Sequence, residues 1–178
     1  LQASNSDKLR FSIVKMVADG SIQGFSARLK WPHYYNGAEN GLWYIEPERL
    51  GEYLKAYTKA GIQVHVHTNG DECTEVALDK IEEAITPKTK VIMPVDISGF
   101  PCDYDEIMNC VQKHSSIFVP SNEKQKKLGR ILIAADSAHS FGATYKNKRS
   151  GSFTDVSCFS FHAVKNLTTA EGGAVCFN

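Results

Sequence analysis

Short apolar runs alternate with amphipathic segments of helical length along this chain. The runs predict strands over residues 11–17, 62–67, 90–95 and 131–135, with shorter strands around 156–161 and 174–177. Between them, apolar residues at helical spacing predict helices over 47–60, 71–85 and 103–111. Because parallel strands need a crossover connection, this alternation favours an α/β fold with a largely parallel or mixed sheet. We expect strands 62–67, 90–95 and 131–135 to share one sheet, on which the first two helices pack.

Composition limits the classes of protein to which the chain can belong. Its 178 residues suffice for one domain or two small ones, and its 42% hydrophobic and 22% charged residues are ordinary for a globular protein. Twenty basic and twenty acidic residues balance, so net charge gives no support for a nucleic-acid or membrane-surface partner. No apolar run approaches the ~18 residues that a membrane span needs. We therefore predict neither nucleic acid nor membrane as a partner.

The five cysteines are odd in number and include no C-x-x-C pair. This pattern argues against a disulfide framework and against a zinc site built on thiolates. We interpret each cysteine as a small buried hydrophobe in a reducing, cytoplasmic setting.

Lys165 follows an apolar run near the end of the sequence, which is an unusual place for a lysine. Asp136 comes directly after the most apolar strand, ILIAA, and Ser160 precedes Lys165 by five residues. Side chains at the carboxyl ends of parallel strands commonly gather around a ligand. An enzyme that uses pyridoxal phosphate needs an amine for the aldehyde, a carboxylate for the ring nitrogen and hydroxyls for the phosphate. On spacing alone, a turn residue at Asp136 and a solvated Lys165 are the favoured interpretations.

Two longer motifs favour a functional interpretation of Asp136 and Lys165 instead. One is D-x-A-H-x-x-G-A, beginning at Asp136, and the other is S-F-H-x-x-K-N-x-T-x-x-E-G-G, beginning at Ser160. With these motifs, the chain from about residue 80 to residue 178 resembles the DegT-type sugar-nucleotide aminotransferases, which are fold-type-I pyridoxal-phosphate enzymes. The resemblance implies a three-layer, aminotransferase-like large-domain segment over residues 84–178. It matches only a middle slice of the family, without the upstream phosphate loop or the downstream small domain, so we expect an incomplete enzyme.

The same resemblance implies a role for each motif residue. Lys165 would form the Schiff base with pyridoxal phosphate, and Asp136 would hold the pyridine nitrogen protonated. His139 would lie against the ring near its 3-hydroxyl, and Ser160 would bind the phosphate. The implied substrates are a nucleotide-linked keto-sugar and an amino donor, glutamate by analogy, and full-length members would be homodimers. We expect Lys165 to lie near Asp136 and Ser160, and His139 to be the partner of Asp136 in the absence of cofactor.

The first half of the chain carries a different pattern. The stretch FSIVKMVADGSIQGFSARL and the later H-x-x-G-D strand end resemble the amidohydrolase superfamily over about residues 7–83. This resemblance implies an incomplete, partial (β/α)-barrel-like segment over residues 1–83. It also implies that Lys15 is a strand lysine that bridges metals when carbamylated, and that His67 is a metal ligand.

Lys15 and His67 alone cannot hold a hydrolytic metal, because such a site needs three or more ligands from several strands. We therefore predict no stoichiometric zinc or other divalent metal. The two resemblances meet near residues 77–85, which suggests a chimera or fused fragments. Three functions remain open: a pyridoxal-phosphate aminotransferase, a metal-dependent amidohydrolase, and a non-catalytic α/β fragment.

Overall fold

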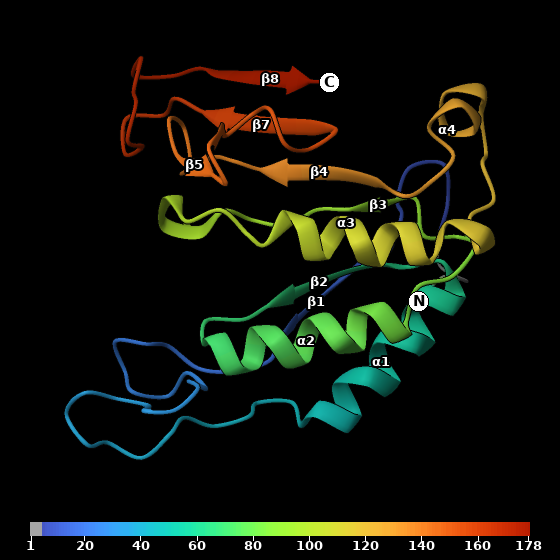
Figure 1. The fold of residues 1–178 in the computed structure, drawn as a ribbon. Helices are drawn as coiled ribbons and strands as arrows, with labels where there is room; N and C mark the ends of the chain where they lie inside the picture. Colours follow the sequence, from blue (N-terminus) through green and yellow to red (C-terminus); the bar gives the residue numbers. More distant parts are fainter. Residues whose placement is uncertain (1–4) are drawn as a thin grey trace. The chain divides into compact units, whose positions relative to one another are not determined.

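The computed structural model describes residues 5–178, and the chain forms two compact units, Leu1–Lys88 and Thr89–Asn178. Each unit has its own strands and helices (Figure 1). None of the helices in the described part of the chain is long and apolar enough to cross a membrane. This division follows contacts within the fold, so the separate origin that we assigned to residues 1–83 remains a prediction.

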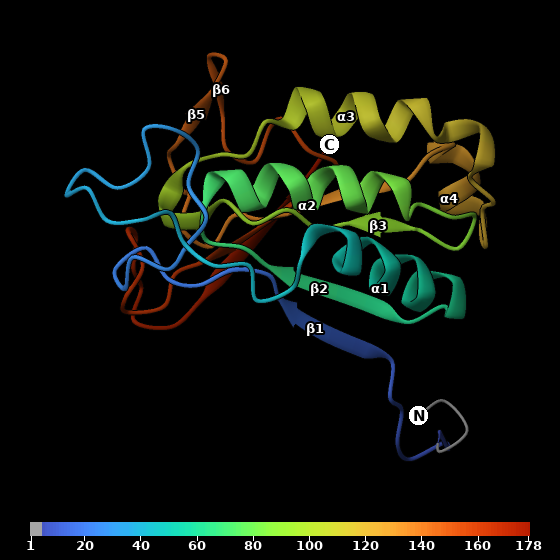
Figure 2. The same ribbon diagram turned by 90° about the horizontal axis from the view of Figure 1, so that it is seen from below.

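The first unit is a strand–helix–strand–helix arrangement. Its elements are β1 (Ile13–Val17), α1 (Pro47–Ala60), β2 (Gln63–His67) and α2 (Asp71–Glu83). The two strands are parallel, with Ile13 opposite Gln63 and Val17 opposite His67. Both helices lie on one side of the strand pair (Figure 2). The connection through α1 is therefore the crossover that parallel pairing requires.

The predicted bounds of α1 are confirmed, and local chemistry explains them. Pro47 occupies the first helical turn, where its missing N–H costs no hydrogen bond. Gly61 ends the helix in the left-handed region at φ 76°, and its N–H donates to the carbonyl of Thr58 at 2.9 Å. Leu50 and Leu54 lie on the buried face between these two ends.

The core of the first unit lies between the two helices and one face of the strand pair. Its buried members come from β1, α1, α2 and the residues next to them, and are Met16, Ala18, Leu50, Leu54, Cys73, Ala77 and Ala84. Val64 and Val66 of β2 pack against them, whereas His65 and His67 point to the opposite, exposed face. The alternation follows from the two-residue period of a strand.

A buried carboxylate holds the long connection that precedes α1. Asp19 is fully buried and accepts the backbone N–H groups of Arg28 at 2.9 Å, Asn69 at 2.8 Å and Gly70 at 2.9 Å. A side chain added at Gly70 would meet the carbonyl oxygen of Arg28 at 1.8 Å. The connection therefore touches the backbone at the start of α2, where only glycine fits.

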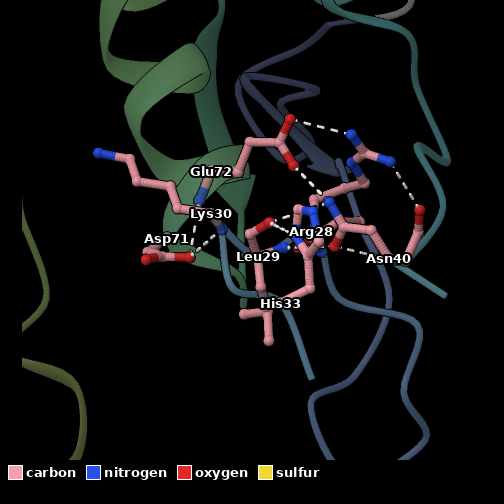
Figure 3. Close-up of polar contacts among 9 residues, drawn as sticks. Arg28, Leu29, Lys30, His33, Asn40, Asp71 and Glu72 are labelled. Carbon is pink, nitrogen blue, oxygen red and sulfur yellow. Dashed lines mark hydrogen bonds and ion pairs between the residues drawn. The ribbon is translucent and has the colours of Figure 1, made fainter. Parts of the chain in front are cut away.

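Charged groups complete the same contact (Figure 3). The guanidinium of Arg28 donates to the carboxylate of Glu72 at 2.9 Å, and the amide of Asn40 donates to its other oxygen at 2.8 Å. Burial raises the pKa of Glu72, but these two hydrogen bonds outweigh it and hold the pKa below its ordinary value. The connection is thus fixed by polar groups that converge on the first turn of α2.

The second unit is built around a four-stranded sheet. Its strands are β3 (Val91–Ile92), β4 (Leu132–Asp136), β7 (Val156–Ser160) and β8 (Gly173–Phe177), with the hairpin strands β5 (Thr144–Tyr145) and β6 (Lys148–Arg149) apart from them. Its helices are α3 (Tyr104–Lys113), α4 (Glu123–Leu128) and two 3₁₀ turns, Ile97–Gly99 and Ser115–Ile117. The sheet order is β3-β4-β7-β8, as Figure 1 shows, and only β8 is antiparallel.

Three predictions about the strands differ from the structure. Residues 62–67 do not join the strands of the second unit, since β2 pairs with β1 in a two-stranded sheet. Among residues 5–178 no barrel-like sheet forms, so a partial barrel is not observed. The strand predicted over 90–95 shortens to Val91–Ile92, with a separate bridge from Val95 to Asp136. Pro94 explains the gap, because it has no N–H for the ladder.

The amino-terminal ends of β4 and β7 are joined by an ion pair. Arg130 donates two hydrogen bonds to Asp155, at 2.7 and 2.6 Å, and the N–H of Ile133 donates to the same carboxylate at 2.8 Å. Burial raises the pKa of Asp155, but the Arg130 and Ile133 hydrogen bonds together hold it below its ordinary value. This pair fixes the relative register of the two central strands.

The first unit should lose stability when a side chain in its core is shortened. Leu50→Ala is expected to lower its free energy of unfolding by about 2–5 kcal/mol, because the buried side chain leaves a cavity. Trp43, which packs against this core, provides the fluorescence signal for urea unfolding. The matched control is Leu78→Ala, since Leu78 is 46% exposed on α2. An equal loss in both variants would contradict the assigned core.

The Asp155 pair should give a defined dependence of stability on pH. Because its pKa is lowered in the folded chain, its contribution is complete above about pH 4 and is lost as the pH falls through the folded value. Asp155→Asn is expected to cost about 2 kcal/mol at neutral pH, and the difference from the parent chain should shrink in acid. Urea unfolding followed by circular dichroism measures this, with exposed Asp79→Asn as the control. A constant difference across the pH range would refute the assignment.

Candidate functional site

The carboxyl ends of β4 and β7 bring two predicted site residues to one edge of the sheet. Asp136 is the last residue of β4 and lies opposite Cys158 of β7. Ser160 ends β7 two residues further on, so its side chain is on the same face as those of Cys158 and Asp136. These two side chains therefore lie on a common surface, as expected for residues at the carboxyl ends of neighbouring parallel strands.

The two faces of this sheet differ in exposure. The face opposite Asp136 carries buried residues, among them Ile133, Ala135 and Phe159. The face that carries Asp136 is open, and its exposed apolar residues are Val91, Met93, Val95, Val175 and Phe177. Any small molecule that reaches Asp136 and Ser160 would lie at the carboxyl edge of this open face.

Asp136 itself is half-buried and closes a turn. One carboxylate oxygen, Oδ1, accepts the N–H of Ala138 at 3.1 Å. Within residues 5–178, the other oxygen, Oδ2, has no hydrogen-bond donor. The turn role that spacing alone favoured is thus present, and it leaves one oxygen of the carboxylate available to a ligand.

Lys165 contacts His139, which joins the loops after β7 and β4. Its Nζ lies 2.8 Å from Nε2 of His139, and both side chains are half-buried. The other ring nitrogen, Nδ1, accepts the backbone N–H of Ser98 at 3.2 Å. The expectation that His139 is the partner of Asp136 is wrong. Asp136 instead accepts the backbone N–H of Ala138, in a turn that aspartate side chains commonly form, and both ring nitrogens of His139 have other partners.

Asp96, which was not predicted from the sequence as a site residue, organises the loops around His139. Asp96 is fully buried and accepts the hydroxyls of Tyr104 at 2.6 Å, Ser140 at 2.7 Å and Ser137 at 3.2 Å. Burial, together with the nearby Asp96 charge, raises the pKa of Tyr104, which therefore stays a donor. The signal was available, since Asp96 follows the run KVIMPV as Asp136 follows ILIAA.

Glycines return the chain from Lys165 into the sheet. Gly172 has φ 146°, and Gly173 begins β8 opposite Ser160. A side chain at Gly173 would meet the carbonyl oxygen of Phe159 at 2.7 Å. The expectation that Glu171-Gly172-Gly173 turns the chain back is confirmed, and it places the Lys165 loop beside the ends of β4 and β7.

Lys15 and His67 lie apart from this cluster, on the exposed face of the β1–β2 pair. Lys15 is opposite His65, and Val17 is opposite His67, so the two predicted metal ligands are diagonal neighbours. In the part of the chain that the structure describes, no group of three histidine, cysteine or carboxylate ligands includes His67. The metal prediction remains a prediction.

A mixed α/β sheet with polar side chains at its carboxyl edge is typical of α/β enzymes that bind a small molecule there. The chain belongs to the DegT/DnrJ/EryC1/StrS aminotransferase family, whose model matches residues 62–178. That range includes residues 62–83, which we had assigned to an amidohydrolase-like segment. This match gives no support for an amidohydrolase-like segment or for a chimera.

Two curated proteins to which the chain is similar are consistent with this family. GDP-perosamine synthase of Caulobacter vibrioides is 39% identical over 99 residues, which cover 56% of this chain and 23% of that protein. UDP-4-amino-4,6-dideoxy-N-acetyl-beta-L-altrosamine transaminase of Helicobacter pylori is 37% identical over 110 residues, covering 62% and 24%. The chain therefore spans about a quarter of the length of these curated relatives.

A solved structure supports the same fold. Spr1654 of Streptococcus pneumoniae, assigned as a sugar aminotransferase and solved in a PLP form, matches with a TM-score of 0.61 at 45% identity. The match covers 68% of this chain and 31% of that one. The mostly parallel, partly mixed sheet is thus part of an aminotransferase fold.

The reactivity of Cys158 should report whether the face of the sheet that carries Asp136 is open. None of the five cysteines is in a disulfide, and burial raises the pKa of Cys73 to about 12 and that of Cys102 to about 11. Cys158 and Cys176 are exposed, so the interpretation of each cysteine as a buried hydrophobe is wrong for these two. In the folded chain, iodoacetamide at about pH 7.5 should modify these two at least about tenfold faster than the other pair, because only an accessible thiolate reacts.

Mass spectrometry of tryptic peptides over time measures each cysteine. The urea-unfolded chain is the control and should show similar rates for all of them. If Cys158 reacted as slowly as Cys73 in the folded chain, the face that carries Asp136 would be covered.

Proposed function

We propose that this chain is part of a pyridoxal-phosphate-dependent aminotransferase that transfers an amino group to a nucleotide-linked keto-sugar, with glutamate as the donor. The observation that carries the proposal is the contact between Lys165 and His139 at the edge that also bears Asp136 and Ser160. Family membership and the sugar-nucleotide names of the relatives support the substrate class.

The residues present fit pyridoxal phosphate. Lys165 offers a half-buried amine, and Asp136 offers a carboxylate oxygen that lacks a donor within the described residues. The hydroxyl of Ser160, which accepts the N–H of His162 at 3.4 Å, keeps its own proton for a phosphate oxygen. His139 would lie beside the ring. The ring nitrogen, the aldehyde and the phosphate of the cofactor would thus each have a matching side chain, namely Asp136, Lys165 and Ser160.

When bound, pyridoxal phosphate supplies an aldehyde that amines attack and a ring that accepts electrons. Asp136 would stabilise the proton on the ring nitrogen, since a carboxylate favours a neighbouring positive charge. Lys165 would carry a proton to or from the substrate carbon through Nζ. His139 would hold Nζ in place between these steps.

No contact favours an amidohydrolase as a second function, because Lys15 and His67 find no third ligand among residues 5–178. A homodimer and a cytoplasmic location remain proposals, which rest on the resemblance and on the five cysteines, none of which is in a disulfide.

Reductive trapping tests the proposal. Pyridoxal phosphate is added to the chain, the product is reduced with borohydride, and the adduct is mapped by mass spectrometry. We expect Lys165 to carry most of the label, and Asp136→Ala to weaken cofactor binding about tenfold through loss of one charged hydrogen bond. Lys148→Ala, an exposed lysine on β6, is the matched control and should change neither result. A label spread over surface lysines and unaffected by Asp136→Ala would refute the proposal.

A further inference from the structure

His139 lies between two hydrogen-bonding groups, and one of them determines which ring nitrogen carries the proton. The backbone N–H of Ser98 lies 3.2 Å from Nδ1, and Nζ of Lys165 lies 2.8 Å from Nε2. A backbone N–H can only donate, so Nδ1 must carry the lone pair. In the neutral ring the proton is then on Nε2, the atom that faces Lys165.

This arrangement also selects the protonation state of Lys165. With its proton on Nε2, His139 donates, and Nζ must accept. An ammonium has three donors and no acceptor, so only the neutral amine can complete the bond. In the opposite arrangement, the ammonium of Lys165 would face a ring that is protonated on Nδ1. The N–H groups of Ser98 and His139 would then point at each other, with no acceptor between them.

We propose that the Ser98 N–H fixes the tautomer of His139 and thereby favours the neutral, nucleophilic amine of Lys165. Ser98 and His139 are positioning residues in this scheme, and they act through hydrogen bonds that need no bound ligand. The consequence for catalysis rests on the proposed function, whereas the tautomer rests on geometry alone. One hydrogen bond of ordinary strength biases the tautomer ratio about fivefold.

The turn that presents Ser98 is shaped for this contact. Ser98 has φ 54° and Gly99 has φ 83°, so the N–H of Ser98 is held in an uncommon backbone geometry. A side chain at Gly99 would lie 2.9 Å from the carbonyl oxygen of His139. The turn and the backbone of His139 therefore approach more closely than most residues allow.

Asp96 holds both sides of this approach. It directly precedes the Ile97–Gly99 turn, and its carboxylate accepts the hydroxyls of Ser137 and Ser140, which flank His139 in sequence. Its own N–H donates to the carbonyl of Asp136 at 3.0 Å. A single buried carboxylate thus fixes the donor turn against the acceptor ring.

The tautomer can be measured in the full chain without cofactor. Two-bond proton–nitrogen NMR spectra of chain labelled with ¹⁵N-histidine distinguish the ring nitrogens. We expect His139 to carry its proton on Nε2. His33 and His114 are internal controls of opposite sign, because their Nδ1 atoms face the carbonyl oxygens of Leu29 at 2.8 Å and Cys110 at 2.9 Å.

A His139 ring that is protonated on Nδ1, or on both nitrogens at neutral pH, overturns the proposal. The result does not depend on pyridoxal phosphate. Failure of reductive trapping with the expected tautomer therefore counts against the proposed function alone.

Competitive acetylation tests the effect on Lys165, since acetic anhydride reacts only with neutral amines. Asp96→Asn should lower Lys165 acetylation at neutral pH about fivefold relative to exposed Lys148, by loosening the Ser98 contact. Asp103→Asn is the matched control, because Asp103 also accepts a tyrosine hydroxyl, that of Tyr145 at 2.6 Å, but lies exposed at the start of α3. Unchanged acetylation in a folded Asp96→Asn chain contradicts the role of Asp96. If that variant does not fold, the NMR measurement on the parent chain decides.

Discussion

The second unit depends on one buried carboxylate, Asp96. A carboxylate without solvent costs several kcal/mol unless hydrogen bonds replace water, and Asp96 accepts four donors. Those donors come from the start of α3 and from the loop after β4, which packing alone would not hold together. The Ser98 turn and His139 are therefore fixed before any ligand arrives, and Lys165 meets a ring whose orientation is already set.

The first unit also contains a buried carboxylate that hydrogen bonds stabilise. Asp19 follows β1, is fully buried, and accepts three backbone N–H groups from two segments. In both units, a buried carboxylate that follows a strand accepts hydrogen bonds from donors in other segments of the chain. The difference lies in what the loops carry: Asp19 secures Arg28 and the start of α2, whereas Asp96 secures the histidine that contacts Lys165.

The open face of the four-stranded sheet gives the site its access. Asp136 and Ser160 project from a surface whose neighbours are apolar and exposed, while the backbone beneath them is anchored by Ile133, Ala135 and Phe159. This combination lets a rigid edge present polar groups to a small molecule. Family membership over residues 62–178 indicates the class of enzyme to which this edge belongs.

The sequence by itself determined the order of strands and helices, the ends of α1 at Pro47 and Gly61, and the motif that contains Lys165. These features depend on local rules: period, turn chemistry and residue spacing. The tertiary structure alone decided that β2 pairs with β1, that Asp136 closes its own turn, and that Ser98 and His139 meet across 41 positions. Strand partners and long-range hydrogen bonds depend on how loops return through space, and hydrophobic periodicity carries no information about that path.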